Sequence, residues 1–110
     1  MEPCYEFYAD NFTKRKDMKR HCKKIIIDLK RSRHFYIGVT NDPTRRLKED
    51  FENHNMETMY VLTKTNKMKQ SIKLEQELIK LFIETKFNIN QSGGGEGIKY
   101  DEMFVYVLFK

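Results

Sequence analysis

The position of Glu75 within a predicted helix is the first sign of chemistry in this sequence. Apolar residues recur at three- and four-residue spacing over residues 67–86, which predicts an amphipathic helix. At about 100° per residue, Glu75 falls between Phe82 and Met68, on the apolar side of that helix. Glu77 falls on the opposite side and is expected in solvent. Because an unpaired buried charge costs several kcal/mol, Glu75 requires an arginine partner, a metal ion or a hydrogen-bond network.

Arg46 is the second candidate, since it is the natural partner to consider for a buried Glu75. It lies in a short predicted helix over residues 43–53, next to Leu47 and near the boundary of the buried stripe. A surface position is the alternative for both Arg45 and Arg46. Asp50 follows four residues later and could form an ordinary helix salt bridge with Arg46.

Two predicted elements precede these candidates and must help to position them. Residues 10–31 are predicted to form a helix that begins at the capping residues Asp10 and Asn11. Residues 34–40 are rich in aromatic and β-branched side chains, which favours a strand. The apolar stripe of the predicted helix contains Met18, Cys22, Ile25, Ile26 and Leu29.

The later elements have clear boundaries in the sequence. Asp42 is suited to cap the helix over 43–53, Pro43 suits its first position, and Leu47 and Phe51 are its expected buried residues. The other predicted elements are a strand over 59–63, the helix over 67–86, a glycine loop over 93–97 and a buried strand over 103–109. The broad apolar side of the helix over 67–86 contains Met68, Ile72, Leu74, Leu78, Ile79, Leu81 and Phe82.

Length and composition restrict the classes of protein that the chain can represent. Its 110 residues, 39% hydrophobic and 34% charged, predict one domain over 1–110 with a modest core. The longest apolar run, 103–109, is far shorter than the roughly 20 residues of a membrane-spanning helix. The acidic N-terminus lacks the apolar core of a signal peptide, so an intracellular protein is expected. Cys4 and Cys22 are expected to be reduced thiols.

The positive charge is concentrated in one segment. Residues 14–33 hold ten basic and two acidic side chains, so this segment has a net charge of +8. The whole chain has a net charge of +5, so the residues outside this segment sum to −3. A basic segment on a weakly acidic body favours a polyanionic partner, because binding to phosphates releases condensed counterions. A solvated helix surface is the alternative explanation.

Four segments taken together resemble the GIY-YIG nuclease superfamily. Residues 36–47, Tyr-Ile-Gly-Val-Thr-Asn-Asp-Pro-Thr-Arg-Arg-Leu, resemble the second half of its signature and its arginine helix. Residues 74–79 resemble its glutamate helix, and Asn88 followed by the glycines at 93–97 resembles its closing asparagine and glycine turn. The resemblance implies an α+β fold with a small antiparallel sheet of about three strands flanked by helices.

The first strand of that pattern is missing from its usual place before Tyr36. Residues 23–27, where it should lie, contain no tyrosine and belong to a predicted helix. The C-terminal segment 105–108, Val-Tyr-Val-Leu, resembles this strand instead. We therefore expect a circular permutation in which the strand moves to the C-terminus and Tyr106 lies beside Tyr36. Tyr5, Tyr8 and Tyr60 are rival donors of the same hydroxyl.

The resemblance also implies a catalytic arrangement for hydrolysis of phosphodiester bonds in DNA. Glu75 would bind one Mg²⁺ or Mn²⁺, and Arg46 would clamp the phosphate. Tyr36, with Tyr106, would position or deprotonate the attacking water. Asn88 would orient the site or fix the turn. Members of the family often carry a histidine where this chain has Asp50, and His54 is a possible substitute or an exposed histidine.

Three function classes are compatible with the sequence. The first is the metal-dependent endonuclease, the second a catalytically inactive nucleic-acid-binding module of the same fold, and the third a protein-interaction domain. DNA is the expected partner, RNA is a further option, no membrane is expected, and both a monomer and a homodimer are compatible with the sequence. The side chains expected to contact nucleic acid are Lys14, Arg15, Lys19, Arg20, Lys23, Lys24 and Arg45.

Overall fold

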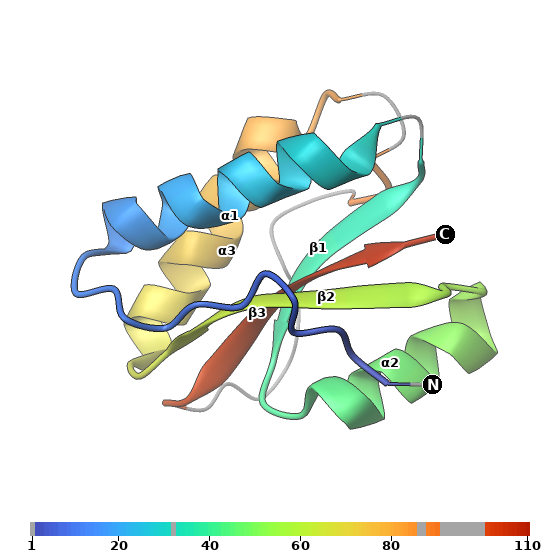
Figure 1. The fold of residues 1–110 in the computed structure, drawn as a ribbon, viewed down its shortest axis with the longest axis horizontal. Coiled ribbons are helices and arrows are strands. Elements are labelled where there is room, and N and C mark those ends of the chain that lie inside the picture. The colour runs from blue at the N-terminus through green and yellow to red at the C-terminus, as the bar shows by residue number, and fades with distance from the viewer. Residues whose placement is uncertain (1, 32, 86–87, 91–100) are drawn as a thin grey trace.

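The C-terminal strand lies in the middle of the sheet (Figure 1). The computed structural model describes residues 2–31, 33–85, 88–90 and 101–110. The strands are β1 (Phe35–Thr40), β2 (Thr58–Thr65) and β3 (Met103–Phe109), antiparallel and in the order β1-β3-β2. The predicted α+β fold with a three-stranded antiparallel sheet flanked by helices is confirmed. β2 is longer than the predicted 59–63 and contains an irregularity between Val61 and Thr63.

The helices cover the two sides of the sheet unequally. α1 (Arg15–Lys30) and α3 (Met68–Phe82) contact each other and pack on one side, and α2 (Pro43–His54) packs on the other (Figure 1). Successive residues of a strand point to opposite sides. The side under α1 and α3, here called the apolar face, contains Phe35, Ile37, Val39, Val105 and Val107. The side under α2, here called the α2 face, contains Tyr36, Tyr106, Leu108, Met59 and Val61.

The capping prediction for α2 is confirmed, but its buried stripe differs from the expected one. Asp42 accepts a hydrogen bond from the Arg45 backbone N–H at 3.2 Å, and Pro43 occupies the first turn. Leu47 is buried as predicted. Phe51 is 47% exposed, whereas Asp50 is buried in its place. Asp50 is held there beside Arg46 and within electrostatic reach of Tyr106 on the sheet.

The long helices are shorter than the sequence predicts. α1 begins at Arg15, with Lys14 as a cap that makes no side-chain hydrogen bond, so the predicted capping by Asp10 and Asn11 is wrong. Asp10 instead accepts the Tyr8 hydroxyl hydrogen bond at 3.0 Å. On α3, Met68 and Leu81 are exposed because they lie at the margins of the buried stripe. The glycine loop predicted over 93–97 lies outside the described residues.

The N-terminal segment protects the outer edge of β2. The Cys4 N–H donates to the Met59 carbonyl at 2.7 Å, and the Val61 N–H donates to the Cys4 carbonyl at 2.9 Å. His21 Nε2 on α1 lies 3.0 Å from both the Phe7 and Leu62 carbonyl oxygens and ties the segment down. Covering an edge strand in this way prevents its pairing with another chain. Within the described residues, no helix is long and apolar enough to cross a membrane.

Candidate active site

Gly38 and Tyr106 are direct cross-strand partners between β1 and β3. The Tyr106 ring lies over Gly38, so that a Cβ atom added there would be 2.6 Å from Cζ and closer still to the hydroxyl oxygen. The glycine is therefore required by the neighbouring ring and not by a turn. The pairing of residues 104–108 with β1, which the permutation hypothesis requires, is confirmed.

Arg46 joins Tyr106 to α2. Its Nε donates to Asp50 Oδ2 at 3.1 Å, which confirms the helix salt bridge considered from the sequence. The Arg46 guanidinium is also a hydrogen-bond partner of the Tyr106 side chain, and Tyr36 lies within electrostatic reach of the same phenol. Three of the predicted site residues, Tyr36, Arg46 and Tyr106, thus gather on the α2 face, with Asp50 as an additional member.

Burial dominates the protonation of this cluster. Desolvation raises the pKa of the Tyr106 phenol well above its ordinary value, and the neighbouring Arg46 lowers this pKa by a smaller amount. Tyr106 therefore keeps its proton at any working pH. Desolvation also raises the pKa of the Asp50 carboxyl, against the opposing effects of Arg46 and His54.

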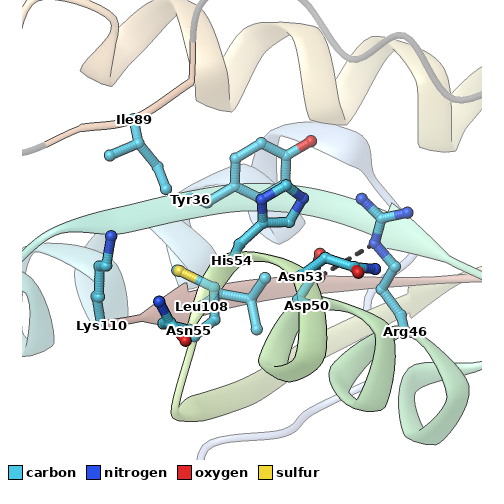
Figure 2. A pocket seen from close by; sticks show the side chains of 10 residues that line it. Tyr36, Arg46, Asp50, Asn53, His54, Asn55, Ile89, Leu108 and Lys110 are labelled. Atoms are coloured by element: carbon cyan, nitrogen blue, oxygen red, sulfur yellow. Dashed lines mark hydrogen bonds and ion pairs between the residues drawn. The ribbon is translucent and has the colours of Figure 1, made fainter.

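A cavity of about 560 Å³ opens beside this cluster on the α2 face. Figure 2 shows Arg46 and Lys110 at opposite ends of the cavity, with the flat side chains of Tyr36 and His54 between them. His54 is exposed, as one of the two interpretations of the sequence expected, and it also lines the cavity. The other lining residues are Asp50, Asn53, Asn55, Met56, Ile89 and Leu108.

The rival tyrosines have other environments. Tyr60 packs against Phe109 on the apolar face, with ring centroids 5.9 Å apart. Tyr8 lies at the margin of the α2 face but donates its hydroxyl hydrogen to Asp10. Tyr5 is 48% exposed and forms an edge contact with Tyr8. Tyr106 is the one of the four that is hydrogen-bonded to Arg46 in the described contacts.

Glu75 is only 2% exposed, so the prediction that it points inward is confirmed. It lies on α3, and it is not among the described residues that line the cavity. Glu77 lies outside the buried stripe, as predicted, and is partly solvated, but its carboxylate also lies 2.6 Å from Arg15 Nε and 3.4 Å from Lys19 Nζ. This ion pair fastens α3 to α1.

Two asparagines follow α3 and have different contacts. Asn88 Nδ2 donates to the Phe82 carbonyl at 2.6 Å, and its Oδ1 accepts from the Asn90 N–H, so Asn88 fixes the turn. The buried Asn90 side chain bonds both the N–H and the carbonyl of Ile37, at 2.9 and 3.0 Å. These two bonds satisfy backbone groups of Ile37 at the edge of β1, where a fourth strand would otherwise pair, next to Tyr36. Sequence reasoning missed Asn90, because its partner is 53 residues away.

A comparison with protein families gives a match over residues 22–107, to the T5orf172 domain. The chain belongs to the T5orf172 domain family. Comparisons with curated proteins and with solved structures gave no match. The T5orf172 domain is a nuclease-associated fold, so the nuclease-related part of the sequence resemblance is confirmed. The matched residues extend from the middle of α1 to β3 and include both Tyr36 and Tyr106.

The basic residues of this T5orf172 domain protein lie mostly away from the cavity. α1 packs on the apolar face, whereas the cavity is on the α2 face. Arg15 and Lys19 pair with Glu77, and Arg45 on α2 pairs with Glu49 at 2.6 Å. The other side chains expected to contact nucleic acid are exposed: Lys14, Arg20, Lys23 and Lys24.

Proposed function

We propose that this T5orf172 domain protein is a metal-dependent endonuclease of the GIY-YIG type that hydrolyses phosphodiester bonds in DNA, with its first strand displaced to the C-terminus. The observation that carries the proposal is the cross-strand pair of Tyr106 and Gly38, with Arg46 hydrogen-bonded to the same tyrosine. In this arrangement β3 takes the place of the missing tyrosine strand at the centre of the sheet, and its Tyr106 contacts Arg46 of α2.

Arg46 would hold the scissile phosphate. Its planar guanidinium matches two phosphoryl oxygens and is charged at any working pH. Asp50 holds Nε, which restricts rotation of the guanidinium at the end of the cavity. Arg46 would therefore stabilise the charge that develops on the phosphoryl oxygens during attack.

The two tyrosines would have separate roles. Tyr36 is half-buried and lines the cavity, so its hydroxyl can position the attacking water. Tyr106 is 1% exposed and retains its proton, because burial raises its pKa. Tyr106 would therefore hold the Arg46 guanidinium in position by its hydrogen bond and would not serve as a base.

Glu75 is the proposed ligand of one Mg²⁺ or Mn²⁺. A hard divalent cation requires oxygen ligands, and water and phosphate oxygens can complete a shell that begins with one carboxylate. Glu75 is buried on α3, and no group of three His, Cys, Asp or Glu side chains gathers around it or elsewhere in the described residues, so water and phosphate oxygens would have to supply the other ligands. When bound, the ion would neutralise phosphoryl charge and lower the pKa of a bound water.

A plasmid-nicking assay tests the proposal. Wild type should nick supercoiled DNA with Mg²⁺ or Mn²⁺ and not with a chelator. Arg46→Ala should lower the rate by roughly 10²–10³-fold, the usual cost of losing one transition-state contact. Lys48→Ala is the matched control, because Lys48 is an exposed cation on the same helix. Glu75→Gln should abolish the metal response, while Glu84→Gln, an exposed carboxylate, should not.

The second candidate is the inactive nucleic-acid-binding module. It is favoured by the partly buried salt bridge that Asp50 forms with Arg46, at the place where family members often carry a histidine. This candidate predicts that wild type and Glu75→Gln bind DNA equally and that neither nicks it under any divalent metal. That result would overturn the endonuclease proposal.

A further inference from the structure

The cavity on the α2 face combines flat walls with cationic ends. Tyr36 and His54 provide an aromatic ring and an imidazole (Figure 2), and the buried residues Leu108 and Met56 provide an apolar part of the lining. Arg46 and Lys110 provide positive charge at opposite ends. A ligand that fills this space should be flat, apolar on its faces and flanked by negative charge.

A nucleobase within a DNA strand has these properties. Its faces stack on flat side chains, its edge carries hydrogen-bonding groups, and a phosphate lies on each side of the nucleoside. The amides of Asn53 and Asn55 also line the cavity and can bond a base edge. A volume of about 560 Å³ is within the ordinary range for sites that enclose small organic groups.

We propose that this cavity receives one unpaired nucleobase next to the phosphate held by Arg46, so that the substrate class is DNA with unpaired nucleotides, such as a single-stranded tail or a bulge. The inference rests on the proposed function, since it places the scissile phosphate at Arg46. In a regular duplex every base is stacked and paired, and removing one costs a few kcal/mol. An unpaired base avoids this cost.

Ile89 lies at the mouth of the cavity and offers a variant outside the proposed catalytic group. Its side chain is 38% exposed, and its backbone N–H bonds the Phe35 carbonyl, a contact that a substitution would retain. Ile89→Asp would place a negative charge where the base and its phosphates enter. Leu81→Asp is the matched control, because Leu81 is an aliphatic residue of similar exposure, 42%, on α3.

The experiment uses the full chain and a DNA duplex with a short single-stranded tail that contains 2-aminopurine. Binding is measured by anisotropy in chelator, which prevents cleavage, and base burial is measured by acrylamide quenching of the 2-aminopurine. Wild type should bind the tailed duplex at least roughly fivefold more tightly than the blunt duplex and should protect the tail base from acrylamide. Ile89→Asp should lose both effects, and Leu81→Asp should retain them.

Several results would overturn the inference. One is a similar affinity for tailed and blunt DNA. Another is acrylamide quenching of the tail base that is the same in the complex as in free DNA. The third is tighter binding of an RNA tail of the same sequence. The outcome is separable from that of the nicking assay. Plasmid nicking without base protection would remove this inference alone, whereas base protection without nicking would remove the endonuclease proposal and leave a base-binding cavity beside a phosphate that is bound but not cleaved.

Discussion

The two faces of the sheet differ in what their side chains can do. The apolar face is closed by α1 and α3 around buried residues such as Phe35, Ile26 and Leu78. The α2 face has a smaller apolar cluster and carries the hydrogen-bonded group of Tyr106, Arg46 and the half-buried Tyr36. The same three strands supply both faces, because alternate residues point in opposite directions. The larger apolar core and the polar cluster thus use alternate positions of the same strands.

The neighbouring residues Phe35 and Tyr36 give the largest expected contrast. Phe35 is fully buried, with an edge contact to Phe82 at 6.0 Å, so Phe35→Ala should lower the free energy of unfolding by about 3–5 kcal/mol. Tyr36→Phe keeps the ring and should change it by no more than about 1.5 kcal/mol while reducing nicking. Urea unfolding of both variants measures the contrast. Comparable losses of stability would show that the α2 face is equally important for the fold.

The close approach of Tyr106 to Gly38 gives the next largest effect. Gly38→Ala should cost about 1–3 kcal/mol of stability, because the new methyl group must displace a buried ring. In a Tyr106→Leu background the same substitution should cost less, and a double-mutant cycle measures the difference. Additive losses would mean that the glycine is required for another reason, which would weaken the permutation argument.

Local sequence signals predicted the elements and the inward position of Glu75, because helix periodicity and capping depend on neighbouring residues. Asp42 and Pro43 marked the start of α2 for this reason. The exchange of Phe51 for Asp50 in the buried stripe could not be predicted, since both flank Leu47 on the helix. Asp50 is buried beside Arg46 of the same helix and within electrostatic reach of Tyr106 on β3, a neighbour that the sequence of the helix alone does not indicate.

Long-range contacts account for the other failures. The Asn90 side chain can bond the backbone of Ile37 because β1 is an edge strand. That β1 lies at the edge follows only once β3 is known to pair with its other edge. Glu77 is an ion-pair partner because α1 crosses α3, which no helical wheel of α3 alone can indicate. The pairing of the C-terminal strand with β1 could be proposed from the sequence because residues 105–108 carry a local strand pattern, a tyrosine within an apolar run.

The pH dependence of the free energy of unfolding tests whether water is excluded from the apolar face. Burial raises the pKa of the Cys22 thiol from 9.0 to about 12. Between these values the unfolded chain loses the proton and the folded chain keeps it, so stability falls as pH rises. At pH 10 the loss is roughly 1.4 kcal/mol. Urea unfolding from pH 8 to 10 should show this loss in wild type and in Cys4→Ala, whereas Cys22→Ala should keep only the smaller loss from Tyr8 and Tyr106, whose pKa values burial also raises. An unchanged slope in Cys22→Ala would mean that water reaches this face.

The smallest effect concerns charges on the outer side of α1, beyond the apolar face. If exposed lysines contact DNA phosphates, Lys23→Gln and Lys24→Gln should each reduce the slope of log affinity against log salt by about 1. Arg15→Gln should reduce it less, because the Arg15 guanidinium already pairs with Glu77 at 2.6 Å. DNA-binding isotherms from low to moderate salt measure the slopes. An equal reduction by all three variants would mean that DNA displaces Glu77 from Arg15, and no change would place the DNA contacts on the α2 face alone.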